Sequence, residues 1–119
     1  MKTNIIREKS YKFALRIIKL YKYLCDEKKE YTLSKQILRS GTAIGAIIEE
    51  AIQAESTADF IHKLSMSNKE ANETHYWLRL LRDSNYLSEK ESESIIIDCE
   101  ELIKLLISII KTMKLKNEK

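Results

Sequence analysis

The sequence predicts an all-α protein, folded as one up-down-up-down antiparallel four-helix bundle over residues 1–119. Proline is absent and glycine occurs only twice, although the turns of β-hairpins, sandwiches and βαβ units use both residues heavily. Hydrophobic residues make up 44% and charged residues 33% of the chain, a balance typical of a globular domain. The apolar residues recur at helical spacing in four segments joined by short connections, which place neighbouring helices antiparallel.

The first helix is expected at about 7–26, and its apolar side carries Phe13, Ile17, Leu20, Tyr21 and Leu24. The segment 26–30 has no apolar residue and is predicted to form the first turn. The second helix is expected at about 32–54. Its core positions alternate spacings of four and three residues, as in a coiled-coil seam: Ile37, Gly41, Ile44, Ile48 and Ala51.

The third helix is predicted to begin at the capping box of Ser56 and Asp59 and to end near Arg82. Its seam consists of Phe60, Leu64, Ser67, Ala71, Thr74, Leu78 and Leu81. Asn85 suits a left-handed backbone conformation in the turn that follows.

A second capping box, formed by Ser88 and Glu91, is predicted to open the fourth helix. The seam of this helix consists of Ile95, Cys99, Leu102, Leu106, Ile109 and Met113. The lysine-rich end from Lys111 is expected to be a fraying terminus.

The N-terminal residues lack the apolar run of a signal peptide, and no stretch of 18 residues is free of charge. We therefore expect a cytoplasmic protein without a membrane segment. Cys25 and Cys99 form no CxxC pair and lie among apolar residues. Buried, reduced thiols are the ordinary interpretation, and a disulfide is the alternative.

No catalytic, metal-binding or cofactor-binding residue is predicted. A di-iron site in a four-helix bundle needs two Glu-x-x-His pairs, whereas His62 and His75 are the only histidines and are preceded at that spacing by Asp59 and Asn72. The chain also lacks a glycine-rich phosphate loop, a haem-attachment motif and a nucleophile elbow. We therefore expect a protein that is not an enzyme.

Two features exceed what a plain bundle requires. Gly41 and Gly45 lie four residues apart in mid-helix, where each costs about 1 kcal/mol of helix propensity. Small residues at this spacing allow another backbone to approach closely, either at a helix crossing within the chain or at a subunit contact. Met66, Trp77 and Leu80 lie off the seam of the third helix. With the two glycines, this strip is our candidate oligomer interface.

The charge is distributed unevenly along the chain, whose net charge is +3. Lys9, Lys12, Arg16 and Lys19 form a stripe on the first helix at a spacing that could follow a phosphate backbone. Lys111 and Lys114 are expected to lie near the start of that helix and to extend the stripe into one nucleic-acid-binding patch. The alternative is a solvated charged face.

Three segments carry a family resemblance: residues 38–51 (LRSGTAIGAIIEEA), 59–64 (DFIHKL) and 69–78 (KEANETHYWL). The chain resembles the four-helix bundle proteins encoded in intervening sequences of bacterial 23S rRNA genes, and the similarity covers nearly its whole length. Relatives of these proteins include the accessory proteins of diversity-generating retroelements.

The resemblance implies a homopentamer built as a barrel of five bundles, without enzymatic activity. The retroelement relatives bind nucleic acid and a reverse transcriptase, so a reverse transcriptase is an expected partner if the gene is linked to a retroelement. Ile47 and Glu49 replace the Asn and the second Ala of the usual Ile-Gly-Ala-Asn-Ile-Ala-Glu motif. From the resemblance and the basic stripe together, we expect a homo-oligomeric bundle that binds the backbone of RNA or DNA. The alternative is a protein-interaction scaffold that binds no nucleic acid.

Overall fold

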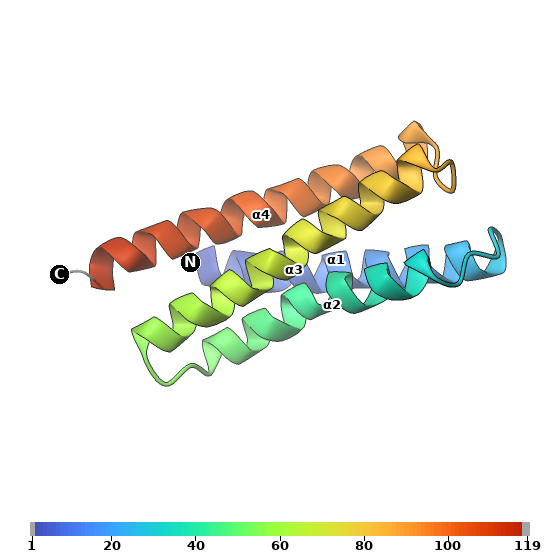
Figure 1. Cartoon of the computed structure of the whole chain (residues 1–119). Coiled ribbons are helices and arrows are strands. Elements are labelled where there is room, and N and C mark those ends of the chain that lie inside the picture. The colour runs from blue at the N-terminus through green and yellow to red at the C-terminus, as the bar shows by residue number, and fades with distance from the viewer. Residues whose placement is uncertain (1, 118–119) are drawn as a thin grey trace.

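The computed structural model describes residues 2–117 and confirms the all-α four-helix architecture. The helices are α1 (Lys2–Asp26), α2 (Leu33–Ile52), α3 (Thr57–Asp83) and α4 (Glu89–Asn117). They form an elongated bundle 51 Å long in which α1 packs against α2 and α4, and α3 packs against the same two helices. Both ends of the chain lie at one end of the bundle, as does the α2–α3 turn (Figure 1).

The core follows the predicted seams closely. Every predicted seam residue of α2 is buried, and so is every one of α3 and α4 except Phe60 and Met113, which are half-buried. On α1, Leu20 and Tyr21 are half-buried, while three other predicted residues are fully enclosed. The three enclosed residues are Phe13, Ile17 and Leu24.

The first helix begins five residues earlier than predicted, at Lys2. Ile6 and Ser10 are both buried and continue the Phe13 and Ile17 side of the helix towards the N-terminus. Because these two residues pack against the other helices, α1 begins before the first residue that the apolar spacing had indicated. At the other terminus, α4 stays helical through Asn117, whereas fraying was expected from Lys111.

Local side-chain chemistry sets the turns. Ser88 and Glu91 bond reciprocally at 3.0 and 2.8 Å, which confirms the second capping box. At the start of α3, Ser56 Oγ accepts the Asp59 N–H at 3.0 Å, so Ser56 is the predicted N-cap, and only this half of the first box is formed. Asn85 adopts the expected left-handed conformation, with φ of 68°. Among the described residues, no helix is long and apolar enough to span a membrane.

The start of α2 is capped by a carboxylate that the sequence analysis did not identify. Glu30 accepts the backbone N–H groups of Thr32, Leu33 and Ser34 at 2.7–3.2 Å, and its residue is buried. A carboxylate at a helix N-terminus satisfies otherwise unpaired donors and opposes the positive end of the helix dipole. Glu30 thus fixes the direction in which the chain enters α2.

Candidate functional site

The two glycines of the predicted oligomer interface face α1 of their own chain. A Cβ atom on Gly41 would lie 2.7 Å from Ile17 Cγ1, and one on Gly45 would lie 3.3 Å from Ser10 Oγ. Of the two interpretations offered by the sequence, the structure supports a close crossing within the chain. Gly41 is also buried, so it lies at no surface that a second subunit could reach.

The predicted strip on α3 is only partly exposed. Met66 is 38% exposed, whereas Trp77 is half-buried and packs against the core, and Leu80 is half-buried. The Trp77 indole N–H donates to Glu73 at 2.9 Å, and Arg39 of α2 binds both Glu73 and Glu70. These carboxylates therefore join α2 to α3.

Internal ion pairs neutralise most of the predicted basic stripe on α1. Arg16 lies 2.5 Å from Asp98, and Lys9 lies 3.1 Å from Glu101, both across the α1–α4 contact. Lys12 pairs with Glu8 on α1 itself at 3.1 Å. Lys19 is the one member of the stripe that has no ion-pair partner within the described residues.

The structure does not join the C-terminal lysines to this stripe. Lys111 and Lys114 line a hollow between α3 and α4, together with Lys69 of α3. Lys9 and Arg16 instead contact the side of α4 that faces α1. The prediction of one continuous patch was therefore wrong. The C-terminal lysines lie on the side of α4 that faces α3, whereas the stripe on α1 lies against the opposite edge of α4.

We call the hollow between α3 and α4 the basic hollow. Its described lining contains three lysines, two neutral polar residues and two isoleucines, and no carboxylate: Ser65, Asn68, Lys69, Ile107, Ile110, Lys111 and Lys114. The basic hollow therefore differs from the stripe, in which most of the basic side chains are already paired with carboxylates of the same chain.

A second apolar series on α1 escaped the sequence analysis. Tyr11, Leu15 and Ile18 are 67%, 49% and 36% exposed, and they follow the helical spacing of four and three residues. Lys19 and Lys22 flank them, and neither forms an ion pair in the described part of the chain. We call these five residues the α1 outer face. The signal for it was present in the sequence, running parallel to the core series of Phe13 and Ile17.

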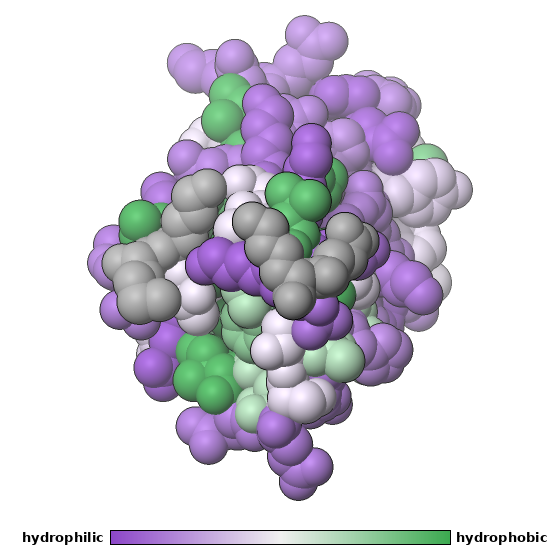
Figure 2. Space-filling view, turned by 90° about the vertical axis from the view of Figure 1, so that its left-hand side faces the viewer, coloured by the Kyte–Doolittle hydropathy of each residue, from purple (hydrophilic) through white to green (hydrophobic). Residues whose placement is uncertain are grey.

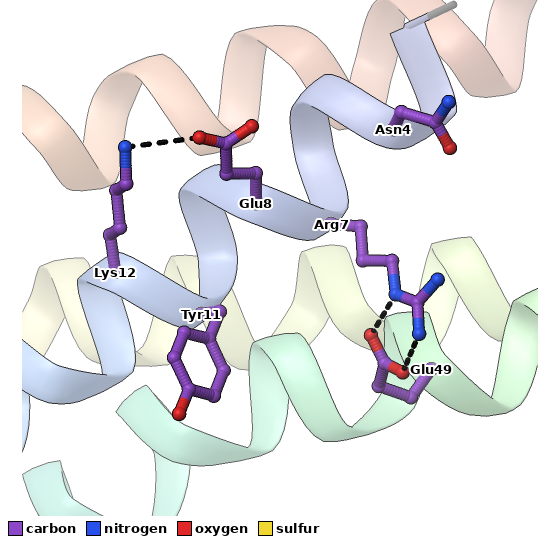
Figure 3. A pocket seen from close by; sticks show the side chains of 6 residues that line it. All are labelled: Asn4, Arg7, Glu8, Tyr11, Lys12 and Glu49. Atoms are coloured by element: carbon purple, nitrogen blue, oxygen red, sulfur yellow. Dashed lines mark hydrogen bonds and ion pairs between the residues drawn. The ribbon is translucent and has the colours of Figure 1, made fainter.

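The N-terminal end of this face borders α2. Arg7 crosses from α1 to bind Glu49 of α2 through two hydrogen bonds of 2.7 and 2.8 Å. Figure 3 shows Tyr11 on the same side of α1 as this pair, with Lys12 and Glu8 on the other side. The Arg7–Glu49 pair links α1 to α2, while the Tyr11 side chain stays exposed.

The end of the bundle that carries the termini also exposes apolar surface. Figure 2 views this end and shows green and pale green surface within a purple margin. A hollow here is lined by residues where α2 ends and α3 begins, together with both terminal helices: Thr3, Ala51, Ile52, Ala54, Ser56, Thr57, Phe60 and Met113. It contains no charged side chain among its described lining residues.

Comparison with known proteins places this arrangement in a family. The profile of the 23S rRNA-intervening sequence protein family matches residues 2–108. The chain belongs to this family. A similar solved structure is that of a protein of unknown function from the S23 ribosomal protein family of Bacteroides thetaiotaomicron, which is 58% identical. The similarity covers 93% of this chain and 99% of that one, with a TM-score of 0.92. No curated protein gives a significant match.

In this member of the 23S rRNA-intervening sequence protein family, His75 and Cys99 have partners within the bundle. Arg79 donates to His75 Nδ1 at 3.1 Å, so His75 Nε2 carries the ring hydrogen and donates to Glu100 at 3.1 Å. Burial raises the pKa of the Cys99 thiol to about 12, and the nearby Glu100 and Asp98 add to the shift. No group of three or more potential metal ligands occurs within the described residues.

Proposed function

We propose that this protein is a non-enzymatic homo-oligomer, a pentamer, that binds the phosphate backbone of RNA or DNA. Five chains of 14.0 kDa would give an assembly of about 70 kDa. Membership of the 23S rRNA-intervening sequence protein family supports this proposal. The function is binding and not chemistry, since the His75 and Cys99 groups described above serve contacts within the bundle.

The basic hollow is the observation that carries nucleic-acid binding. Its three lysines line one depression without a carboxylate among the described lining residues, so a phosphate would not need to displace an internal acid. At Lys9, Lys12 and Arg16 it would have to compete with Glu101, Glu8 and Asp98. Lysine contacts to phosphate release counterions and require no particular base sequence. We therefore assign the contact to Lys69, Lys111 and Lys114.

A salt series tests this assignment. Fluorescence anisotropy of a labelled single-stranded RNA should show binding at about 50 mM salt that weakens steeply as salt rises. Replacing Lys111 and Lys114 with alanine should lower the log–log salt slope by about 1.4 for each subunit engaged. Lys12→Ala is the matched control, because Lys12 is already paired with Glu8, and it should leave the slope within about 0.3 of the wild-type value.

Two results would contradict the assignment. Wild-type protein that does not bind RNA or DNA at low salt would remove nucleic-acid binding from the proposal. A slope that falls with Lys12→Ala but not with the Lys111 and Lys114 double variant would return the contact to α1. Light scattering tests the assembly separately, and a monomer whose mass is independent of concentration would exclude the pentamer.

A protein-interaction scaffold is the second candidate, and the α1 outer face favours it. Exposed apolar residues gathered on one helix typically mark a protein contact. This function would stand alone if the assembled protein binds neither RNA nor DNA at low salt.

A further inference from the structure

Two outer faces of the bundle carry exposed apolar side chains and opposite charge. The first is the α1 outer face, and residues 7–22 around it contain six basic side chains and one carboxylate. The second lies on the opening turns of α4, where Ile97 is 55% exposed and lines a hollow with Glu89, Glu93 and one basic residue, Arg82 of α3. We call Glu89, Glu93 and Ile97 the α4 outer face. Residues 89–101 contain six carboxylates and one lysine.

The chain already pairs these two helices by charge. Arg16 binds Asp98 and Lys9 binds Glu101 along the inner edge of both faces. Further round each helix, Lys19, Lys22 and Glu93 have no ion-pair partner within the described residues. Opposite charges thus remain on two surfaces of one chain that point in different directions.

A cyclic assembly needs two such surfaces. In a ring of five, no two-fold axis relates neighbouring subunits, so each subunit must present two different faces that complement each other. Pairing the α1 outer face with its own copy would bring lysines against lysines, which costs free energy. Pairing it with the α4 outer face brings lysines against glutamates and isoleucine against leucine and tyrosine.

The positions of the helices agree with ring closure. Helices α1 and α4 are neighbours in the bundle, and the outward directions of neighbouring helices in a square bundle lie about 90° apart. Closed rings of four, five and six subunits need contact faces about 90°, 108° and 120° apart. Faces on α1 and α4 therefore suit a small ring.

We propose that the α1 outer face docks against the α4 outer face of a second copy of this chain. The inference rests on the proposed homo-oligomer and names the contact that forms it. It replaces Gly41, Gly45 and the Met66 strip as the interface. The α4 lining of the basic hollow begins at Ile107, ten residues beyond Ile97, so the proposed contact does not use the lysines of the basic hollow.

Charge reversal tests the pairing. The α1 variant Lys19→Glu with Lys22→Glu, and the α4 variant Glu89→Lys with Glu93→Lys, should each raise the dissociation constant of the assembly more than about a hundredfold. The chain that carries all four reversals should assemble again, because every contact then pairs opposite charges. Sedimentation velocity gives the mass, and far-UV circular dichroism checks that each chain is helical. Lys111→Glu with Lys114→Glu is the matched control and should leave the mass unchanged.

The apolar centre of the face provides a second variant. Leu15→Asp alters a residue that is 49% exposed, so the subunit should fold and remain monomeric. Full assembly in the two double variants and in Leu15→Asp would overturn the inference while leaving the oligomer itself intact. The inference would also be overturned if both double variants fail to assemble and the chain that carries all four reversals fails to assemble as well. A monomeric wild type would overturn the proposed oligomer as well.

Discussion

Replacing Gly41 with alanine tests whether this glycine is required by the contact between α1 and α2. The new Cβ would lie 2.7 Å from Ile17 Cγ1, 2.8 Å from Cγ2 and 3.0 Å from Cδ1. Ile17 is fully buried and β-branched, so its side chain has few other rotamers to adopt. The two helices must therefore separate or Ile17 must strain.

Overpacking of this kind costs about 1–3 kcal/mol, whereas alanine in place of glycine in a helix returns about 1 kcal/mol. We expect Gly41→Ala to lower the free energy of unfolding by about 0–2 kcal/mol. Gly45→Ala is the matched control, because its Cβ would meet Ser10 Oγ at 3.3 Å and backbone oxygen at 3.4 Å. It should be neutral or stabilising by up to about 1 kcal/mol.

Urea unfolding followed by far-UV circular dichroism, repeated at several protein concentrations, measures both changes. Gly41→Ala should be less stable than Gly45→Ala by up to about 3 kcal/mol, or up to about 10 °C in melting temperature. In an Ile17→Ala background the same Gly41→Ala substitution should become stabilising, because the clashing atoms are gone. Gly41→Ala equal to or above Gly45→Ala in stability would refute the close-crossing argument.

Three further outcomes follow from the contacts described above. Glu30→Ala leaves three backbone N–H groups at the start of α2 without their acceptor and should cost about 1–2 kcal/mol in urea unfolding; an unchanged midpoint would show that water replaces the cap. Hydrogen bonds from Ser88 and Tyr23 lower the pKa of Glu91 from its ordinary 4.5, so its contribution to stability is complete above about pH 4.5 and is lost as pH falls further. Thermal melts from pH 6 to 3 should therefore fall less steeply in Glu91→Gln than in wild type. With its pKa raised to about 12, Cys99 should resist maleimide at pH 8 while the half-buried Cys25 reacts, giving one label per folded chain by mass spectrometry and two after unfolding.

Local patterns predicted the helices because the relevant interactions lie close in sequence. The reciprocal bonds of Ser88 and Glu91 span three residues, and the alternating spacing of Ile37, Ile44 and Ile48 specifies one buried side of α2. Glu30 was missed because it caps α2 from two residues before the N-cap position, Thr32, outside the usual capping box.

The candidate site was less predictable because it depends on which helices meet. The spacing of the basic residues on α1 predicted a stripe. The partners of Lys9 and Arg16 could not be predicted in this way, because Glu101 and Asp98 lie more than eighty residues away in the sequence. Periodicity gives the angle of a residue round its own helix and not the axial register between helices. The same limit applies to Gly41, since spacing alone did not distinguish Ile17 of the same chain from a second subunit.

The charged contacts between helices also bear on the handedness of the bundle, which is the direction in which α1 to α4 follow one another around its axis. Four antiparallel helices with one apolar side each can be arranged clockwise or anticlockwise, and the apolar seams point to the axis in both arrangements. In the opposite hand, Arg16 would turn towards α2 and Arg7 towards α4. Each of the four helix contacts has a polar side-chain pair on its outside. Three are ion pairs, Arg7–Glu49, Arg39–Glu70 and Arg16–Asp98, and the fourth is the hydrogen bond between His75 and Glu100. A surface pair is worth about 0–1 kcal/mol, so no single pair holds the bundle together. All four are satisfied in only one hand, however, and together with the fit of Gly41 against Ile17 they favour the observed arrangement over its mirror topology.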